Sequence, residues 1–263
     1  MPEPTSPAII QGGMGVGVSQ WRLAGAVART GQLGVVSGVA LDSLLARRLQ
    51  HGDPGGHLRE ALAHFPAPEI ARRILDRYFV PGGIAADRPY RPVPRLRLGA
   101  NRAGVELTVA GNFVEVFLAK QGHRGPIGVN YLEKIQMAAP AALYGAMLAG
   151  VDYVLVGAGI PSEYPRLLDA LAAHAAVELP VTVAGAGSNE RHTVGFDPAW
   201  ILEPGHRLHR PKLLAIISSA VLAVRLARDP LTRPDGFILE GSTAGGHSAP
   251  PRGNPQLAES GEP

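Results

Sequence analysis

Short apolar runs alternate with segments of helical periodicity from the start of the chain. Residues 8–11 form an apolar run, Gly12 and Gly13 follow it, and apolar side chains then recur at helical spacing over residues 21–28. A second apolar run, at residues 33–37, comes directly after this helix. The order of strand, helix and strand predicts a βαβ unit whose two strands run parallel.

The same alternation returns in the second half of the chain. Further strands are predicted at residues 126–130, 153–156, 212–217 and 236–240, and helices at 107–120, 138–149, 164–176 and 220–228. Six core strands that alternate with helices predict a parallel α/β fold. A closed (β/α)8 barrel of the TIM type needs eight such units, and after Gly246 the chain is loop-like and rich in Pro and Gly. We therefore expect a barrel with about six of its eight units.

Residues 42–98 do not follow this alternation. Up to residue 79 they have a charged helical pattern, and residues 81–98 are rich in Pro and Arg. We interpret residues 42–98 as a helical insertion and linker after the second strand. The linker arginines could grip a phosphate, but the prolines between them favour a solvated segment; these arginines are Arg88, Arg91, Arg95 and Arg97.

A second insertion is predicted at residues 178–210. Strand patterns at residues 180–184 and 192–196 flank Gly187-Ser-Asn-Glu190, as the strands of a hairpin flank their turn. Both insertions are assigned to a single incomplete barrel domain that covers residues 1–263.

Composition narrows the class of protein. A chain of 263 residues with 46% hydrophobic content can bury one large core. The 25 basic and 22 acidic residues are nearly balanced, so a nucleic-acid partner is not indicated. Without cysteine there is no disulfide, thiolate nucleophile or Cys-ligated metal site. No signal peptide and no run of 18 apolar residues is evident, so we expect a cytoplasmic protein without a membrane partner.

Glycine dominates the residues that follow the predicted strands, where parallel α/β folds bind ligands. The segments are Gly12-Gly13-Met14-Gly15, Ser37-Gly38, Asn130, Gly157-Ala158-Gly159, Ser218-Ser219 and residues 240–247. Bare backbone of this kind suits a flat ring or a phosphate. The glycine spacing matches neither the dinucleotide fingerprint nor the nucleophile elbow of hydrolases. His206 and His209 have the spacing of metal ligands, but few acidic residues are near, so no metal site is predicted.

His247 is the candidate catalytic residue. It follows the last predicted strand, the acidic Glu240 and the pair Gly245-Gly246. An imidazole can act as a general base near neutral pH without a large pKa shift. A loop histidine that hydrogen-bonds the backbone would have the same sequence context, so position alone leaves both interpretations open.

Four segments in order resemble the signature blocks of the nitronate monooxygenase (2-nitropropane dioxygenase) family. They are Ile9-Ile-Gln-Gly-Gly-Met14, Leu33-Gly-Val-Val-Ser37, Pro126-Ile-Gly-Val-Asn130 and Ala244-Gly-Gly-His247. The resemblance implies noncovalently bound FMN at the mouth of the barrel. The implied cofactor-binding residues are Gly12, Gly13, Met14, Asn130, Glu240, Gly245 and Gly246, and His247 matches the base or hydrogen-bond donor of the family. The implied partners are a nitroalkane or nitronate substrate and dioxygen, and the products are a carbonyl compound and nitrite.

Two other functions stay open. Flavin-dependent enoyl-acyl carrier protein reductases, which use FMN and NAD(P)H, share these blocks. Residues 215–217 are apolar here, whereas many nitronate monooxygenases carry a basic or polar residue in this strand. The family also resembles other TIM barrels in holding phosphate with loops after strands seven and eight, which we expect this chain to lack. A noncatalytic fragment that pairs with a partner, or a homo-oligomer, is therefore the third interpretation.

Overall fold

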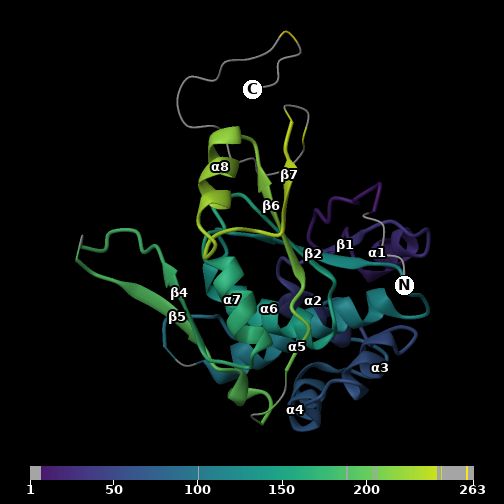
Figure 1. The fold of residues 1–263 in the computed structure, drawn as a ribbon. Coiled ribbons are helices and arrows are strands. Elements are labelled where there is room, and N and C mark those ends of the chain that lie inside the picture. Colours follow the sequence, from purple (N-terminus) through teal and green to yellow (C-terminus); the bar gives the residue numbers. More distant parts are fainter. Residues whose placement is uncertain are drawn as a thin grey trace.

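The computed structural model describes residues 7–99, 101–187, 189–203, 205, 207–241, 244 and 259. Its centre is a parallel sheet in the order β1-β2-β3-β6-β7 (Figure 1). The strands are β1 (Gly34–Ser37), β2 (Ile127–Leu132), β3 (Tyr153–Gly157), β6 (Lys212–Ile217) and β7 (Gly236–Leu239). All four pairings between neighbours are parallel. The predicted parallel α/β class is confirmed.

The prediction of a strand at residues 8–11 is wrong. This segment is reduced to a single parallel bridge between Ile10 and Leu33. Two hydrogen bonds support it: Gln11 N donates to Leu33 O at 3.0 Å, and Leu33 N donates to Ile9 O at 3.1 Å. The apolar run has only four residues between Pro7 and the glycines, so it has no room for a longer ladder.

The two faces of the sheet carry different clusters, because side chains alternate along each strand. Val36, Val129 and Val154 point into the main hydrophobic core, which they share with the helices. The opposite face carries a separate small cluster of Leu33, Val35 and Leu155. Partly buried side chains at alternate positions extend this second cluster across the sheet; they are Tyr153, Leu214, Ile216 and Ile238.

The helices that follow the strands cover one face. The elements in this layer are α1 (Trp21–Ala28), α5 (Arg102–Lys120), η1 (Gln136–Ala138), α6 (Ala139–Leu148), α7 (Tyr164–Ala172) and α8 (Ala220–Arg228). The first four α-helices bury side chains in the main core, and α8 packs Leu226 against Ala215 and Ile217. Ala215 and Ile217 share a face with the core residue Leu213, because they lie two and four residues further along β6.

The predicted helical insertion contains three helices, namely α2 (Leu41–Gln50), α3 (His57–Ala63) and α4 (Pro68–Tyr78). They pack around α5, and their apolar side chains belong to the same core as Val129. A buried carboxylate also links the helices: Glu115 of α5 accepts from Arg48 Nη1 and from Trp21 N, both at 2.8 Å. Residues 81–98 contain neither helix nor strand. No helix in these described ranges is both long and apolar enough to cross a membrane.

The hairpin of β4 (Val177–Val181) and β5 (His192–Phe196) extends away from the body of the molecule, followed by η2 (Pro198–Trp200) (Figure 1). The predicted antiparallel pairing is correct, but its first strand begins at residue 177 and its connection covers residues 182–191. Val177 and Leu179 bury their side chains, whereas Val183 is 39% exposed. Burial of Val177 and Leu179 therefore favours a first strand at residues 177–181 over the predicted residues 180–184.

Candidate active site at the carboxyl ends of the strands

Residues 12–14, here called the glycine loop, lie against the face of β1 and β2 that carries Val35 and Asn130. Gly13 has a φ of +64°, a conformation that costs an L-residue energy. A Cβ atom at Gly13 would lie 2.4 Å from Val35 Cγ1 and 3.0 Å from Asn130 Cβ. This close approach requires glycine, and it leaves the backbone of the loop without a side chain at that point.

Asn130 connects the glycine loop to β2. Its side chain is buried, and its Nδ2 donates to Gly12 O at 2.9 Å and lies 3.4 Å from Met14 Sδ. The structure therefore brings together four of the residues that the sequence analysis assigned to cofactor binding. These four come from segments more than 110 positions apart in the chain.

Two polar residues that sequence reasoning missed hold the glycine loop in place. The Gln11 side chain accepts from Val35 N at 3.0 Å and donates to Ser19 Oγ. Ser19 Oγ in turn donates to Val35 O at 2.9 Å, and Ser37 N donates to Ser19 O at 2.8 Å. The signal in the sequence was a glutamine that ends an apolar run directly before two glycines.

Glu240 lies at the same edge of the sheet but is not in contact with Asn130. It follows β7, and its backbone N donates to Ile217 O at 2.8 Å. Because β3 and β6 separate β2 from β7, the two residues are three strands apart, roughly 14 Å at the usual spacing. Gly245, Gly246 and His247 lie outside the described residues, so their placement relative to Asn130 stays a prediction.

Further polar groups lie near the carboxyl ends of β2 and β3. The Tyr131 hydroxyl donates to Asn112 Oδ1 at 2.8 Å, and Glu133 accepts from Gln136 Nε2 at 3.1 Å. Tyr164, the first residue of α7, is buried, and its hydroxyl has no hydrogen-bond partner within the described part of the chain. Burial raises the pKa of Tyr164, and Glu133 raises it further, so the phenol stays protonated at neutral pH. Sequence periodicity gave no sign of this hydroxyl.

The described cavities include three between helices. One of about 370 Å³ lies between α4 and α5, another of about 260 Å³ between α5, α6 and the hairpin, and a third of about 300 Å³ beside α1 and α3. Over the described ranges, no group of three or more His, Asp or Glu side chains could hold a metal ion. Among the described residues, the polar groups near the strand ends include bare backbone, the Asn130 amide, the Tyr164 hydroxyl and the carboxylate of Glu133.

Comparison with models of known protein families and with curated proteins finds no match to this chain.

Proposed function

We propose that this protein is an FMN-dependent oxidoreductase of the nitronate monooxygenase type, which oxidises alkyl nitronates or nitroalkanes with dioxygen to carbonyl compounds and nitrite. The observation that carries the proposal is the contact between the Asn130 amide and the glycine loop. This contact joins the first and third of the four blocks on which the family resemblance rests. These two blocks thus meet at the edge of the sheet where parallel α/β enzymes bind their ligands.

The strand order supports a barrel of the (β/α)8 type over a doubly wound fold. Neighbouring strands follow one another in chain order, and the helices of the main core and α8 share one face of the sheet. In a doubly wound sheet the strand order reverses once, and helices then cover both faces. Right-handed crossovers that always step in one direction place every helix on the outside, as in a barrel wall.

The described residues fit the flat ring of a flavin. At Gly13 a Cβ would overlap Val35, so the loop approaches β1 and β2 with bare backbone, and Met14 Sδ lies beside the Asn130 amide. Because Asn130 donates through Nδ2 to Gly12, its Oδ1 atom can accept a hydrogen bond from a ligand. Gly12, Gly13 and Met14 would line the ring, and Glu240, Gly245 and Gly246 complete the proposed set. When bound, FMN would take electrons from the substrate and pass them to dioxygen.

The protein's own residues would position the substrate and move its proton. A ring nitrogen of His247 would take the proton from the carbon that bears the nitro group, which converts a neutral nitroalkane into its nitronate. The hydrogen bonds of the half-buried Gln11 and the buried Ser19 would hold the glycine loop rigid against β1. A rigid loop lowers the ordering cost of cofactor binding.

The test is an ultraviolet–visible spectrum of the purified chain after incubation with FMN and desalting, followed by an assay of nitrite release from a nitronate. We expect retained flavin absorbance and nitrite without NAD(P)H. Asn130→Ala should lower FMN retention about tenfold, in line with the loss of one buried hydrogen bond and its loop contact. Asn189→Ala, at an exposed position in the hairpin connection, is the matched control and should retain FMN like the wild type.

Three other outcomes would change this interpretation. Oxidation of NAD(P)H with an enoyl thioester, without nitrite release from nitronates, would favour the enoyl reductase. Absence of flavin from the wild-type chain would contradict the proposal and favour the noncatalytic interpretation. Equal FMN retention by the Asn130 and Asn189 variants would show that Asn130 does not contribute to FMN binding.

A further inference from the structure

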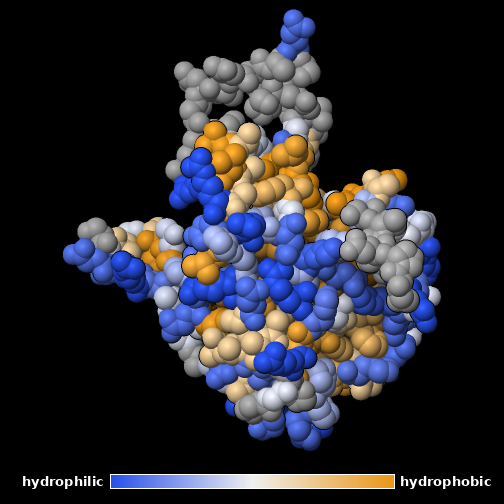
Figure 2. All heavy atoms as spheres, viewed as in Figure 1, coloured by the Kyte–Doolittle hydropathy of each residue, from blue (hydrophilic) through white to orange (hydrophobic). Residues whose placement is uncertain are grey.

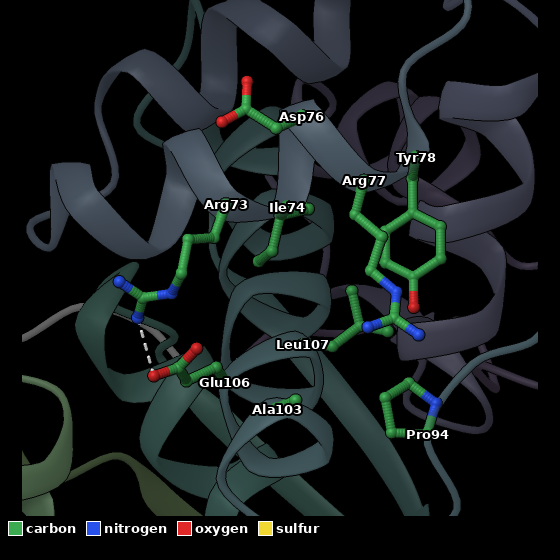
Figure 3. A pocket seen from close by; sticks show the side chains of 9 residues that line it. All are labelled: Arg73, Ile74, Asp76, Arg77, Tyr78, Pro94, Ala103, Glu106 and Leu107. Carbon is green, nitrogen blue, oxygen red and sulfur yellow. Dashed lines mark hydrogen bonds and ion pairs between the residues drawn. The ribbon is translucent and has the colours of Figure 1, made fainter.

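The cavity of about 370 Å³ between α4 and α5, here called the α4–α5 groove, combines an apolar floor with a rim of charged side chains (Figure 3). Its floor is formed by Ile74, Ala103 and Leu107, and Pro94 of the linker lines it as well. Arg73 and Arg77 of α4 line the same groove, together with the carboxylates of Asp76 and Glu106. An apolar cavity with a few charged groups is the usual composition of a small-molecule site, and this volume is within the range of about 300–1,000 Å³ for such sites.

The two arginines are held near each other by the helix. They are four residues apart, so they lie on the same side of α4, and their like charges repel. Ile74 and Tyr78, each the next residue in the chain, are buried against the core. This burial fixes the rotation of α4 and keeps both arginine stems along the rim of the groove.

One of these charges is compensated. Arg73 Nη2 lies 2.7 Å from Glu106 Oε1, and Arg102 Nε lies 3.0 Å from the same oxygen. Glu106 is 6% exposed, and Figure 3 shows this pair at the Arg73 end of the groove. A single buried carboxylate is thus shared by two guanidinium groups, which leaves an excess of positive charge at this end.

The other charge has no carboxylate partner among the described residues. No Asp or Glu oxygen of the described ranges lies within 4.0 Å of the Arg77 guanidinium, and Asp76 points away from Leu107 (Figure 3). Arg91 adds a further positive charge nearby, because its Nη1 donates to Arg77 O at 2.6 Å. The Arg77 guanidinium lies 5.5 Å from the centre of the Tyr78 ring, over the apolar side of the groove.

We propose that the α4–α5 groove binds a small organic anion, a carboxylate with a short aliphatic stem. The planar Arg77 guanidinium binds the carboxylate with paired hydrogen bonds, and Arg73 adds to the attraction from one helical turn away on the same rim. The stem lies on Ile74, Leu107 and Pro94. The site is on the outer helical layer and shares no residue with the glycine loop, so it is independent of the proposed oxidase function.

The experiment is a titration of the full chain with hexanoate, acetate and 1-hexanol, followed by the melting temperature and by calorimetry. Hexanoate should bind saturably, while acetate lacks the stem and 1-hexanol lacks the charge, so both should bind at least about tenfold more weakly. Arg77→Gln should weaken hexanoate about tenfold or more. Arg228→Gln, an exposed arginine in the last turn of α8, is the matched control and should bind like the wild type.

A second variant tests the shape of the groove without a change of charge. Ala103→Leu places a larger apolar side chain at an exposed position of α5 that lines the groove, and it should exclude the hexanoate stem. Equal hexanoate affinity in the Arg77 and Arg228 variants would overturn the proposal. So would equal binding of hexanoate and 1-hexanol, or full hexanoate affinity in Ala103→Leu. FMN retention should be unchanged in all three variants, which separates this site from the flavin site.

Discussion

Along the strand order of the parallel sheet, the end formed by β1, β2 and β3 is buried more completely than the end formed by β6 and β7. At the β1–β3 end, Leu155 is 1% exposed, and every residue of α6 except Leu148 is buried. At the β6–β7 end, Leu239 is 77% exposed, and Leu226 is the one buried residue described in α8. Figure 2 shows apolar side chains at the surface over α8 and β7.

On the face that the helices cover, this difference follows from the number of helices over each strand. On the opposite face, Leu155 is buried in its cluster with Leu33 and Val35. The strands β1 and β2 are covered by α1 and α5, and α5 is itself packed between α1, α2 and α6. The strand β7 pairs only with β6 in the described structure, and α8 packs on the carboxyl-terminal half of β6, against Ala215 and Ile217. We infer that the β1–β3 end provides most of the folding free energy, because buried apolar area is the main stabilising contribution. The glycine loop and Asn130 belong to this end, whereas Glu240 belongs to the other.

Truncation of one leucine at each end tests the comparison most directly, with the largest expected effect. Leu155→Ala should lower the free energy of unfolding by about 2–5 kcal/mol, because it leaves a cavity in a packed cluster. Leu239→Ala should change it by less than about 0.5 kcal/mol, because the side chain is already in water. Urea unfolding followed by circular dichroism measures both. Similar losses for the two variants would show that the β7 end is buried in solution.

A pair of glycine substitutions tests the glycine loop with the next largest effect. Gly13→Ala should destabilise by about 2–4 kcal/mol, because its Cβ overlaps Val35 and its φ is positive. Gly31→Ala has a positive φ of 80° but nothing within 4 Å of its Cβ, so only the conformational cost of about 1–2 kcal/mol applies. Thermal and urea unfolding give both values. The difference between the two isolates the overlap with Val35; no difference would mean that the loop moves freely away from β1.

The strands of the sheet could be predicted from the sequence because buried parallel strands form continuous apolar runs, as at residues 126–130 and 153–156. The local sequence pattern did not show which distant segments of the chain contact each other. The pairing of β4 depends on burial of Val177 and Leu179 against the body, which a local pattern of turn residues does not reveal. In the site, Gln11 and Ser19 both form hydrogen bonds with the backbone of Val35, which lies 24 and 16 positions further along the chain, respectively. The family resemblance pointed to Asn130, but its hydrogen bond to Gly12 O could not be predicted, because the two residues are 118 positions apart in the chain.

Alkaline pH tests the same comparison with the smallest effect. The buried tyrosines Tyr78, Tyr131, Tyr144 and Tyr164 belong to α4, β2, α6 and α7, and no tyrosine occurs in residues 207–241. Burial raises the pKa of all four, that of Tyr144 to about 12. A tyrosine with a raised pKa in the folded state contributes its full stability below the unfolded pKa of about 10 and loses it as the pH rises toward the folded pKa.

We therefore expect the free energy of unfolding to decrease above about pH 9, and by pH 10 the loss should be about 0.4 kcal/mol for each buried tyrosine. Urea midpoints at several pH values measure it, and near-ultraviolet absorbance reports phenolate formation. Tyr144→Phe removes the hydrogen bond of the hydroxyl to His174 Nδ1 at every pH, but it should also reduce the slope of stability against pH by about a quarter. An unchanged slope would show that the Tyr144 hydroxyl is reached by water, and that the helical layer over the β1–β3 end is less closed than its burial indicates.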